Sequence, residues 1–431
     1  MKVGIYSLGC KVNIYESEYI TELLKNHNYE IVPFTEPADI YIINTCSVTN
    51  ESDRKSRKII REAKRHNPNA IVIAMGCYTQ IKAKTNKDEI EADIILGNKD
   101  KTMIVSIIEE YLKNNNQLID IHNLREDIHF EDMTIHTFTN HTRAFVKIQD
   151  GCNAFCSYCI IPYARGQMRS KNFDKVLEEV RTLVNNGYKE IVLTGIHTGR
   201  YGQDINTNLE TLLKELLTIP NLYRLRLSSI EINEVTDGII KLLKDSSIMA
   251  KHLHIPLQSG SDKILKSMNR KYDLNFFLNR VKTIKEEIPD ISLTTDLIVG
   301  FPGETDEDFL DTINTLNTIK FTKIHTFPYS KREGTPASVM ENQVDGVVKK
   351  RRVKEVLKLS SCLEHQFYLK YLNQTLDGLS EQYKDGKVSV LTSNYIQVLV
   401  SSEIPNNKRV LVKITDVLDD NQVFGEVIEK R

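Results

Sequence analysis

Three short apolar runs near the start of the chain each end on a cysteine: VGIYSLGC (3–10), DIYIINTC (39–46) and AIVIAMGC (70–77). Segments with helical spacing, such as ESEYITELLKN and RKIIREAKR, lie between these runs. Buried apolar strands that alternate with amphipathic helices are typical of βαβ units and a parallel sheet. Since the carboxyl ends of parallel strands meet at one edge of the sheet, we expect the three thiols to converge there.

Cys10, Cys46 and Cys77 are therefore candidates for a metal centre. Three thiolates can hold an iron–sulfur cluster in which one iron lacks a protein ligand. The alternative is that each cysteine is a small hydrophobic residue at the end of a buried strand, because free cysteines are often buried. Recurrence at the same topological position favours the metal centre. In a reducing compartment, grouped cysteines also indicate metal ligands or reactive thiols before disulfides.

A second cysteine group has the spacing C-x3-C-x2-C within GCNAFCSYCIIPYARG, and it comprises Cys152, Cys156 and Cys159. A structural zinc site would need four protein ligands, and no fourth cysteine or histidine completes this set. A four-iron cluster with one open iron fits three ligands. The group follows the first strand of a second alternating series, with strands predicted at 144–149, 190–195, 223–229, 252–259, 291–300 and 323–330. Six β/α units predict a complete or partial parallel barrel, with its chemistry at the carboxyl ends of the strands.

The chain of 431 residues is too long for one core of ordinary size, so several domains are expected. We predict an α/β fold with an N-terminal parallel βαβ domain (1–114), a connection (115–141), a partial (β/α)6 barrel (142–370) and a small all-β barrel (371–431). The last unit rests on short β-like segments such as KVSVLTS and KRVLVKITDVL. No apolar run approaches the ~18 residues of a membrane span, and no signal-peptide pattern is present. A cytosolic protein is expected.

The whole chain resembles the radical S-adenosylmethionine (SAM) methylthiotransferases, which combine a three-cysteine domain, a radical-SAM barrel and a C-terminal TRAM domain in this order. The matching stretches are LGCKVNIYES, NTCSVTNESDRKSRKIIR, VKIQDGCNAFCSYCIIPYARG, RLSSIEI, HIPLQSGS and DLIVGFPGE. The sequences of these stretches are most similar to those of the branch that modifies threonylcarbamoyladenosine in tRNA. After the first cysteine stand Lys11, Val12 and Asn13. At these positions the isopentenyladenosine branch tends to carry Gln-Met-Asn, and the ribosomal-protein branch tends to carry Pro-Lys-Asn.

The resemblance implies two [4Fe–4S] clusters, one on each cysteine group, and two SAM molecules per turnover. The open iron held by Cys152, Cys156 and Cys159 would bind SAM, whose cleavage gives a 5′-deoxyadenosyl radical that attacks C2 of the modified adenosine 37. The cluster on the other three cysteines would deliver the sulfur. The implied partners are a tRNA with a modified adenosine beside the anticodon and a cytosolic electron donor. A monomer in the cytoplasm is the expected working unit.

The resemblance also implies SAM contacts at the strand ends and the cysteine loop, at Tyr158, Thr194, Gly195, Ser229, Glu231, Gln258 and Gly300. RNA contacts are expected at Arg54, Lys55, Arg57 and Lys58 after Cys46, and at Lys408 and Arg409 in the TRAM-like segment. A charged run is usually a solvated helix face, but a position beside a sulfur-donor site favours phosphate contact. Residues 371–431 hold nine acidic against seven basic residues, so RNA binding there would be weak or would rely on a local patch. His252 and His254 are predicted to face opposite sides of their strand.

Three alternatives stay open on the sequence alone. The enzyme could act on isopentenyladenosine in tRNA or on an aspartate of a ribosomal protein. A protein of another class would carry its clusters only to bind RNA, without catalysis. In the third alternative, the cluster on Cys10, Cys46 and Cys77 only relays electrons.

Overall fold

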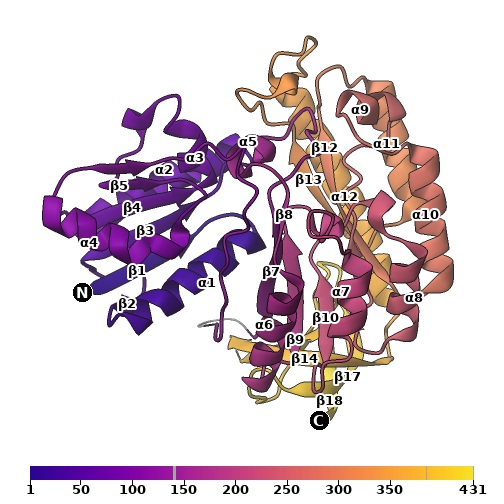
Figure 1. The fold of residues 1–431 in the computed structure, drawn as a ribbon. Helices are drawn as coiled ribbons and strands as arrows, with labels where there is room; N and C mark the ends of the chain where they lie inside the picture. The colour runs from indigo at the N-terminus through magenta and orange to yellow at the C-terminus, as the bar shows by residue number, and fades with distance from the viewer. Residues whose placement is uncertain (139–141, 385, 431) are drawn as a thin grey trace.

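The computed structural model describes residues 1–138, 142–384 and 386–430, and its N-terminal part is built on a six-stranded sheet (Figure 1). Every strand pair in this sheet is parallel, in the order β2-β1-β3-β4-β5-β6. The strands are β1 (Lys2–Ser7), β2 (Glu30–Val32), β3 (Ile40–Thr45), β4 (Ile71–Gly76), β5 (Ile94–Leu96) and β6 (Leu118–Asp120). The strand β6 comes from the segment predicted as a connection, and the end of that segment, 139–141, lies outside the described residues.

Helices cover both faces of this sheet, because successive residues of a strand point to opposite sides. The helices are α1 (Lys11–Asn26), α2 (Asn50–His66), α3 (Cys77–Lys82) and α4 (Ile104–Asn114). Ile42 of the central strand packs in one hydrophobic core with α1 and α4. Its neighbour Tyr41 packs in a second core with α2, on the other face. The predicted parallel βαβ arrangement is thereby confirmed.

Six parallel strands form the central part, with the order β10-β9-β7 in one sheet and β11-β12-β13 in another. A bridge between Leu225 and Met249 connects the two sheets into one curved wall. The strands are β7 (Ala144–Asp150), β9 (Glu190–Gly195), β10 (Arg224–Leu227), β11 (His252–His254), β12 (Ser292–Val299) and β13 (Lys323–Pro328), and the short β8 (Arg169–Ser170) pairs antiparallel with β7. This arrangement confirms the predicted partial (β/α)6 barrel.

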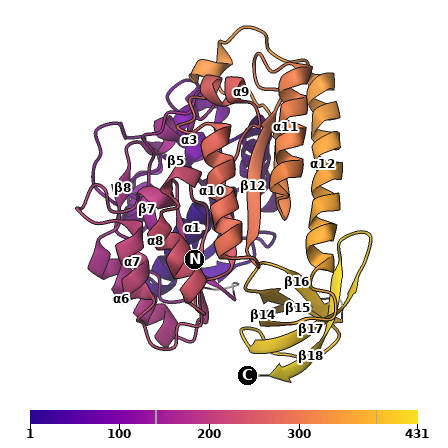
Figure 2. The same ribbon diagram turned by 90° about the vertical axis from the view of Figure 1, so that its right-hand side faces the viewer.

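The helices of the central part lie on the outer side of the curved wall (Figure 2). Two short helices are exceptions, since α5 (Ile161–Arg165) contacts α3 and α9 (Asp262–Ser267) belongs to a separate small core with Phe301. The outer helices are α6 (Phe173–Asn185), α7 (Leu209–Leu216), α8 (Asp237–Asp245), α10 (Leu274–Glu287) and α11 (Asp306–Ile319). Their apolar faces and the strands share one large hydrophobic core. Tyr15 of α1 belongs to the same core, and its hydroxyl donates to Glu179 Oε1 (2.8 Å). Helix α1 therefore attaches the N-terminal sheet to the side of the barrel, beside β7 (Figure 1).

The long helix α12 (Gly346–Leu369) leads into a closed five-stranded barrel at the C-terminus (Figure 2). Its strands are β14 (Thr375–Lys384), β15 (Lys387–Thr392), β16 (Gln397–Val400), β17 (Arg409–Val417) and β18 (Val423–Lys430), which confirms the predicted all-β unit. Arg224, the first residue of β10, donates from Nη1 to Leu391 O (2.9 Å). The small barrel therefore sits at the amino ends of the parallel strands, the end opposite to their carboxyl edge. Among the described residues, no helix combines the length and apolar character that a membrane crossing requires.

Candidate active site

Cys10, Cys46 and Cys77 follow three adjacent strands, β1, β3 and β4, at the carboxyl edge of the N-terminal sheet. Cys46 and Cys77 are buried, and Cys10 is exposed. The loops of the first two cysteines touch, because a Cβ on Gly9, whose φ is +100°, would lie 2.8 Å from Cys46 Sγ. Burial, together with the neighbouring thiol of Cys77, raises the pKa of Cys46 to about 11. The three thiols lie close enough to influence one another electrostatically, and their role as a ligand set stays a prediction.

Cys152, Cys156 and Cys159 lie on the loop between β7 and α5, at the carboxyl edge of the barrel strands. The loop is folded tightly, since the backbone N–H of Cys159 donates to Cys156 O (3.0 Å). Burial raises the pKa of Cys159 to about 12, with further contributions from the other two thiols. Buried thiolates that lie close together repel one another, so these thiols ionise only when a cation or cluster binds and displaces their protons. Both triplets therefore fit the three-thiolate clusters that the sequence implies.

Side chains from distant parts of the chain contact three of these sulfur atoms. Asn98 Nδ2 donates to Cys77 Sγ (3.4 Å), and Arg270 Nη1 donates to Cys156 Sγ (3.4 Å). His197 Nδ1 lies 3.4 Å from Cys152 Sγ. Sequence reasoning missed these residues because they have no motif of their own. Only the structure could identify them.

The segments that follow the two cysteine groups meet between the N-terminal sheet and the barrel. Asn98 Nδ2 also donates to Ala164 O (2.9 Å), so one side chain connects Cys77 to the helix that follows Cys159. A cavity of about 190 Å³ opens between the two parts. Its lining comes from the segment after Cys46, from the second cysteine loop and from the barrel strand ends: Val48, Thr49, Tyr158, Cys159, Ile160, Ile161, Gln258, Asp296, Ile298, Phe327, Pro328, Tyr329 and Ser330.

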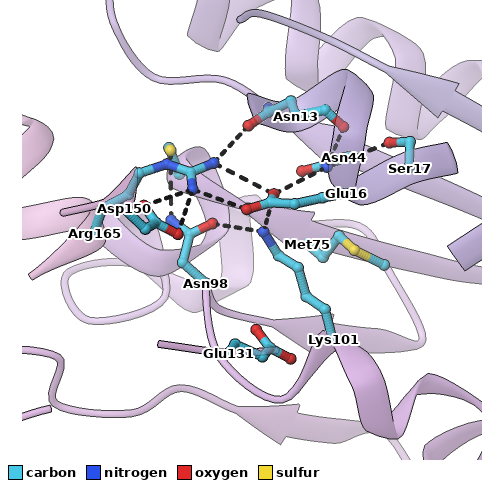
Figure 3. Close-up of polar contacts among 12 residues, drawn as sticks. Asn13, Glu16, Ser17, Asn44, Met75, Asn98, Lys101, Glu131, Asp150 and Arg165 are labelled. Atoms are coloured by element: carbon cyan, nitrogen blue, oxygen red, sulfur yellow. Dashed lines mark hydrogen bonds and ion pairs between the residues drawn. The ribbon is translucent and has the colours of Figure 1, made fainter. Parts of the chain in front are cut away.

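A buried cluster of charges joins the two parts on one side of this region (Figure 3). Arg165 Nη1 donates to Glu16 Oε1 (2.9 Å) and to Asp150 Oδ1 (3.1 Å), and its Nη2 donates to Asn13 Oδ1 (2.7 Å). Lys147 and Lys101 also pair with the Glu16 carboxylate. Although burial raises the pKa of Glu16, these three cations hold it well below its usual range. Although Cys10 is exposed as a residue, desolvation of its thiol by the surrounding protein raises its pKa, and the Arg165 guanidinium opposes that rise, so this cation lies within electrostatic reach of the first triplet.

Two of the residues predicted to contact SAM line the cavity, Tyr158 and Gln258. The Tyr158 ring packs edge-on against Phe301, with ring centroids 6.5 Å apart. Gln258 has a left-handed backbone (φ +66°), and its N–H donates to Asp296 O (2.9 Å). Non-glycine residues in this conformation are uncommon and concentrate at functional sites. A role of Gln258 in binding stays a prediction.

The other predicted SAM contacts lie elsewhere around the same edge. Thr194 and Gly195 end β9, and Ser229 follows β10. Glu231 pairs with Arg270 and borders a smaller cavity beside Cys156. Gly300 is turned toward α12, since a Cβ there would lie 2.4 Å from Lys349 Cγ.

His252 and His254 do not face opposite sides of their strand, and that prediction was wrong. His252 Nε2 lies 3.1 Å from Thr294 Oγ1, and His254 Nδ1 lies 3.0 Å from the same oxygen. Residues two apart in a strand share a face, because side chains alternate with a period of two. Both rings therefore point to the same side of β11.

The basic residues predicted to contact RNA fall into two groups. Arg54, Lys55 and Lys58 are exposed on α2, which begins four residues after Cys46, while Arg57 lies over the Tyr78 ring at 5.9 Å. Arg54 also pairs with Glu51 at 2.6 Å. In the C-terminal barrel, Lys408 is exposed, but Arg409 Nε donates to Asp377 Oδ1 (2.9 Å) and its guanidinium lies over the Tyr223 ring. Arg409 is thus engaged at the junction between the two barrels.

Comparison with protein families and curated proteins finds relatives over almost the entire chain. A family model described as the Radical SAM superfamily matches residues 146–316, and one described as Uncharacterized protein family UPF0004 matches residues 2–97. Threonylcarbamoyladenosine tRNA methylthiotransferase MtaB of Bacillus subtilis is 43% identical, with 96% of this chain and 93% of that protein covered. The protein of the same name from Thermotoga maritima is 37% identical, over 94% of this chain and 92% of its own. A tRNA-2-methylthio-N(6)-dimethylallyladenosine synthase from Acetivibrio thermocellus is 35% identical, over 87% of this chain and 79% of its own.

Among solved structures, the fold is similar to that of the radical S-adenosylmethionine methyltransferase TsrM from Kitasatospora setae, determined with cobalamin and a [4Fe–4S] cluster bound. The TM-score is 0.57 and the sequence identity 13%, with 78% of this chain and 77% of that chain covered. At this identity the likeness concerns the fold alone.

Proposed function

The chain belongs to the family of radical-SAM tRNA methylthiotransferases, and from this premise we propose that it inserts a methylthio group at C2 of N6-threonylcarbamoyladenosine, adenosine 37, beside the anticodon of tRNA. The observation that carries the proposal is the 43% identity over 96% of the chain to a protein named for this reaction. Proteins named MtaB are 35–43% identical, whereas the dimethylallyladenosine synthases reach 34–35%. The chain's own Lys11, Val12 and Asn13 point the same way.

In this proposal each cysteine triplet holds one [4Fe–4S] cluster. When bound, the clusters and SAM supply the electron, the radical that breaks an unactivated C–H bond, and the sulfur atom. The chain's own residues hold and shield these groups. Asn98 and Arg270 orient sulfur ligands by donating N–H groups, and the buried Arg165 offsets negative charge near Cys10. The apolar lining of the cavity excludes water from the reacting centre.

We further propose that the sulfur comes from the triplet Cys10, Cys46 and Cys77, while Cys152, Cys156 and Cys159 serve SAM. The cavity supports this division of labour, because its lining includes Cys159 of the second triplet and Val48 and Thr49, which follow Cys46 closely in the chain. An enzyme in which the first triplet only relays electrons would need it for every turnover. Replacing all three of its cysteines with alanine distinguishes the two cases. A sulfur donor predicts that SAM cleavage survives and sulfur insertion is lost, whereas a relay predicts that both are lost.

The three functional units would be 1–114 for sulfur delivery, 142–370 for SAM chemistry and 371–431 for RNA binding, connected by 115–141. Each triplet is complete within one chain, so we take a monomer as the working unit. Because tRNA is modified in the cytoplasm, we infer a cytoplasmic enzyme and a cytosolic electron donor.

Mass spectrometry of tRNA nucleosides tests the substrate. A strain that lacks the protein should lose 2-methylthio-N6-threonylcarbamoyladenosine and accumulate the unmodified form, and expression of the chain should restore it. Loss of the isopentenyl product, or of a ribosomal-protein modification, would instead assign one of the other branches. The reduced, reconstituted protein should also form 5′-deoxyadenosine from SAM. If none forms, the protein is a non-catalytic iron–sulfur protein and the proposal fails.

A further inference from the structure

A short segment after β13 contacts both cysteine-bearing loops. We call residues 330–338, with the sequence SKREGTPAS, the strap. The strap begins at Ser330, on the wall of the cavity, and ends in a 3₁₀ turn at Pro336–Ser338. The sequence motifs gave no reason to single it out.

One end of the strap holds the segment that carries Cys46. Arg332 is 5% exposed, and its Nη2 donates to Ser47 Oγ (2.7 Å) and to Asp53 Oδ2 (2.7 Å). Its Nη1 donates to Asn50 Oδ1 (2.8 Å). A second contact runs in the other direction, from the backbone N–H of Asn50 to Ser330 Oγ (3.0 Å). Ser47 follows Cys46 directly, so the Arg332 guanidinium is hydrogen-bonded to residues that closely follow a proposed cluster ligand.

The other end of the strap holds the second cysteine loop. The backbone N–H of Ala337 donates to Ser157 O (2.8 Å), and Ser157 lies between Cys156 and Cys159. Ala337 is fully buried in a small apolar cluster, against which Tyr158 packs. Both anchor points of the strap thus lie one residue away from a cysteine.

The strap is stiff between these two ends. Thr335 donates to Arg332 O from its backbone N–H (3.1 Å) and from Oγ1 (2.7 Å). Ser338 Oγ donates to Thr335 O (2.6 Å), and both side chains are almost completely buried. Local side-chain bonds of this kind give the backbone carbonyls partners without a helix or strand. The distance between the anchors is therefore fixed by the strap itself.

We propose that the strap sets the separation between the two cysteine triplets across the cavity, with Arg332 as its positioning residue. This rests on the proposed function, in which sulfur passes from one triplet to a substrate activated at the other. The Arg165–Glu16 cluster, Tyr15 of α1 and the Asn98–Ala164 bond all join the two parts on the β7 side, and attachment on one side alone would let them hinge about it. Arg332 supplies an attachment on the β13 side, and attachment on both sides fixes the spacing. A small misplacement of reacting groups costs much of the rate, so this spacing governs sulfur transfer.

The substitution Arg332→Lys tests the proposal in the anaerobically reconstituted two-cluster protein. Lysine keeps the charge that Asp53 needs but cannot reproduce the fork on three partners. We expect amide hydrogen exchange across 47–53 to rise about tenfold, because a local opening that costs ~1.4 kcal/mol less is ten times more populated. Iron content and 5′-deoxyadenosine formation should stay at the wild-type level. The ratio of 5′-deoxyadenosine to methylthiolated nucleoside should rise severalfold.

The matched control is Arg280→Lys, in helix α10. Arg280 also donates its fork across elements, to Val235 O (2.7 Å) and Asp237 Oδ1 (2.5 Å), but it lies on the outer layer of the barrel. It should leave both readouts unchanged. If the Arg332→Lys protein loses iron, Asp53→Asn is used as the test variant instead, since it weakens the same Arg332–Asp53 ion pair by changing the carboxylate.

Unchanged exchange at 47–53, an unchanged product ratio, or the same effects in the Arg280 control would overturn the proposal. Should the wild-type protein produce no methylthiolated nucleoside at all, the proposed function fails. The exchange measurement would still decide whether the strap holds the Cys46 segment.

Discussion

The buried carboxylate of Glu16 offers a quantitative test of how the two halves of the site are held together. It is 1% exposed and pairs with Arg165, Lys147 and Lys101. The substitution Glu16→Gln removes its charge while keeping its volume. Arg165 and Lys147 would retain Asp150, at 3.1 and 2.8 Å. Lys101, which is completely buried, would keep only the amide oxygen of Asn98 at 3.0 Å among the described contacts.

One cation therefore loses its carboxylate, and breaking a buried pair from one side costs about 3–5 kcal/mol. We expect the low end, about 3 kcal/mol of the free energy of unfolding at pH 7, because glutamine can still accept hydrogen bonds. Urea denaturation of the cluster-free protein, followed by circular dichroism, measures this. Glu51→Gln is the control, since the Glu51–Arg54 pair is exposed on α2, and it should leave the midpoint unchanged.

The pH dependence of the free energy of unfolding provides a second test of the Glu16 contribution. The pKa of Glu16 is depressed in the folded protein, so its stabilising effect is present above the unfolded-state pKa of about 4.3. That effect is lost as the pH falls toward the depressed value. The gap between wild type and Glu16→Gln should therefore be widest near neutral pH and narrow below about pH 4. A variant as stable as wild type at pH 7, or a gap that stays constant on acidification, would refute the reasoning.

Three further changes test the site and its surroundings. Replacing either Cys46 or Cys152 with alanine should reduce the iron of anaerobically purified protein from about eight to about four atoms per chain; an unchanged content would rule that cysteine out as a ligand. Arg270→Met removes the donor from Cys156 Sγ. Because N–H donors to cluster sulfur raise the reduction potential, a titration followed by electron paramagnetic resonance should give a more negative value. An identical potential would show that this contact does not tune the cluster. Changing Arg54, Lys55 and Lys58 together to alanine should weaken tRNA binding and reduce the salt slope by about 2, whereas an unchanged slope would mean that this face of α2 is only solvated.

The placement of the cysteines could be predicted from the sequence because it follows from topology. Strands that end on a thiol must bring those thiols to one edge when the sheet is parallel, and Cys10, Cys46 and Cys77 obey this rule. The second group needed no tertiary information, since its spacing is contained in one loop. The order of the barrel strands followed in the same way from their alternation with helices.

The residues that join the parts could not be predicted, because each acts over a long separation in sequence. Arg165 meets Glu16 across 149 positions, and Arg332 meets Asp53 across 279. A single arginine in a turn-rich segment forms no periodic pattern, and its role can be recognised only when the position of its partner is known. The strand β6 escaped notice for a different reason: its three residues lie in a polar stretch and depend on β5 for pairing.

The docking of the small C-terminal barrel at the amino ends of the parallel strands has a consequence for how an RNA can be held. The strand β12 alone has eight residues, which corresponds to about 26 Å at ~3.3 Å per residue. An RNA that touches Lys408 while presenting a base to the cavity must span at least this height along the outside of the protein. The protein would then select a nucleotide by its distance from the RNA contact on the C-terminal barrel rather than by the identity of the neighbouring nucleotides.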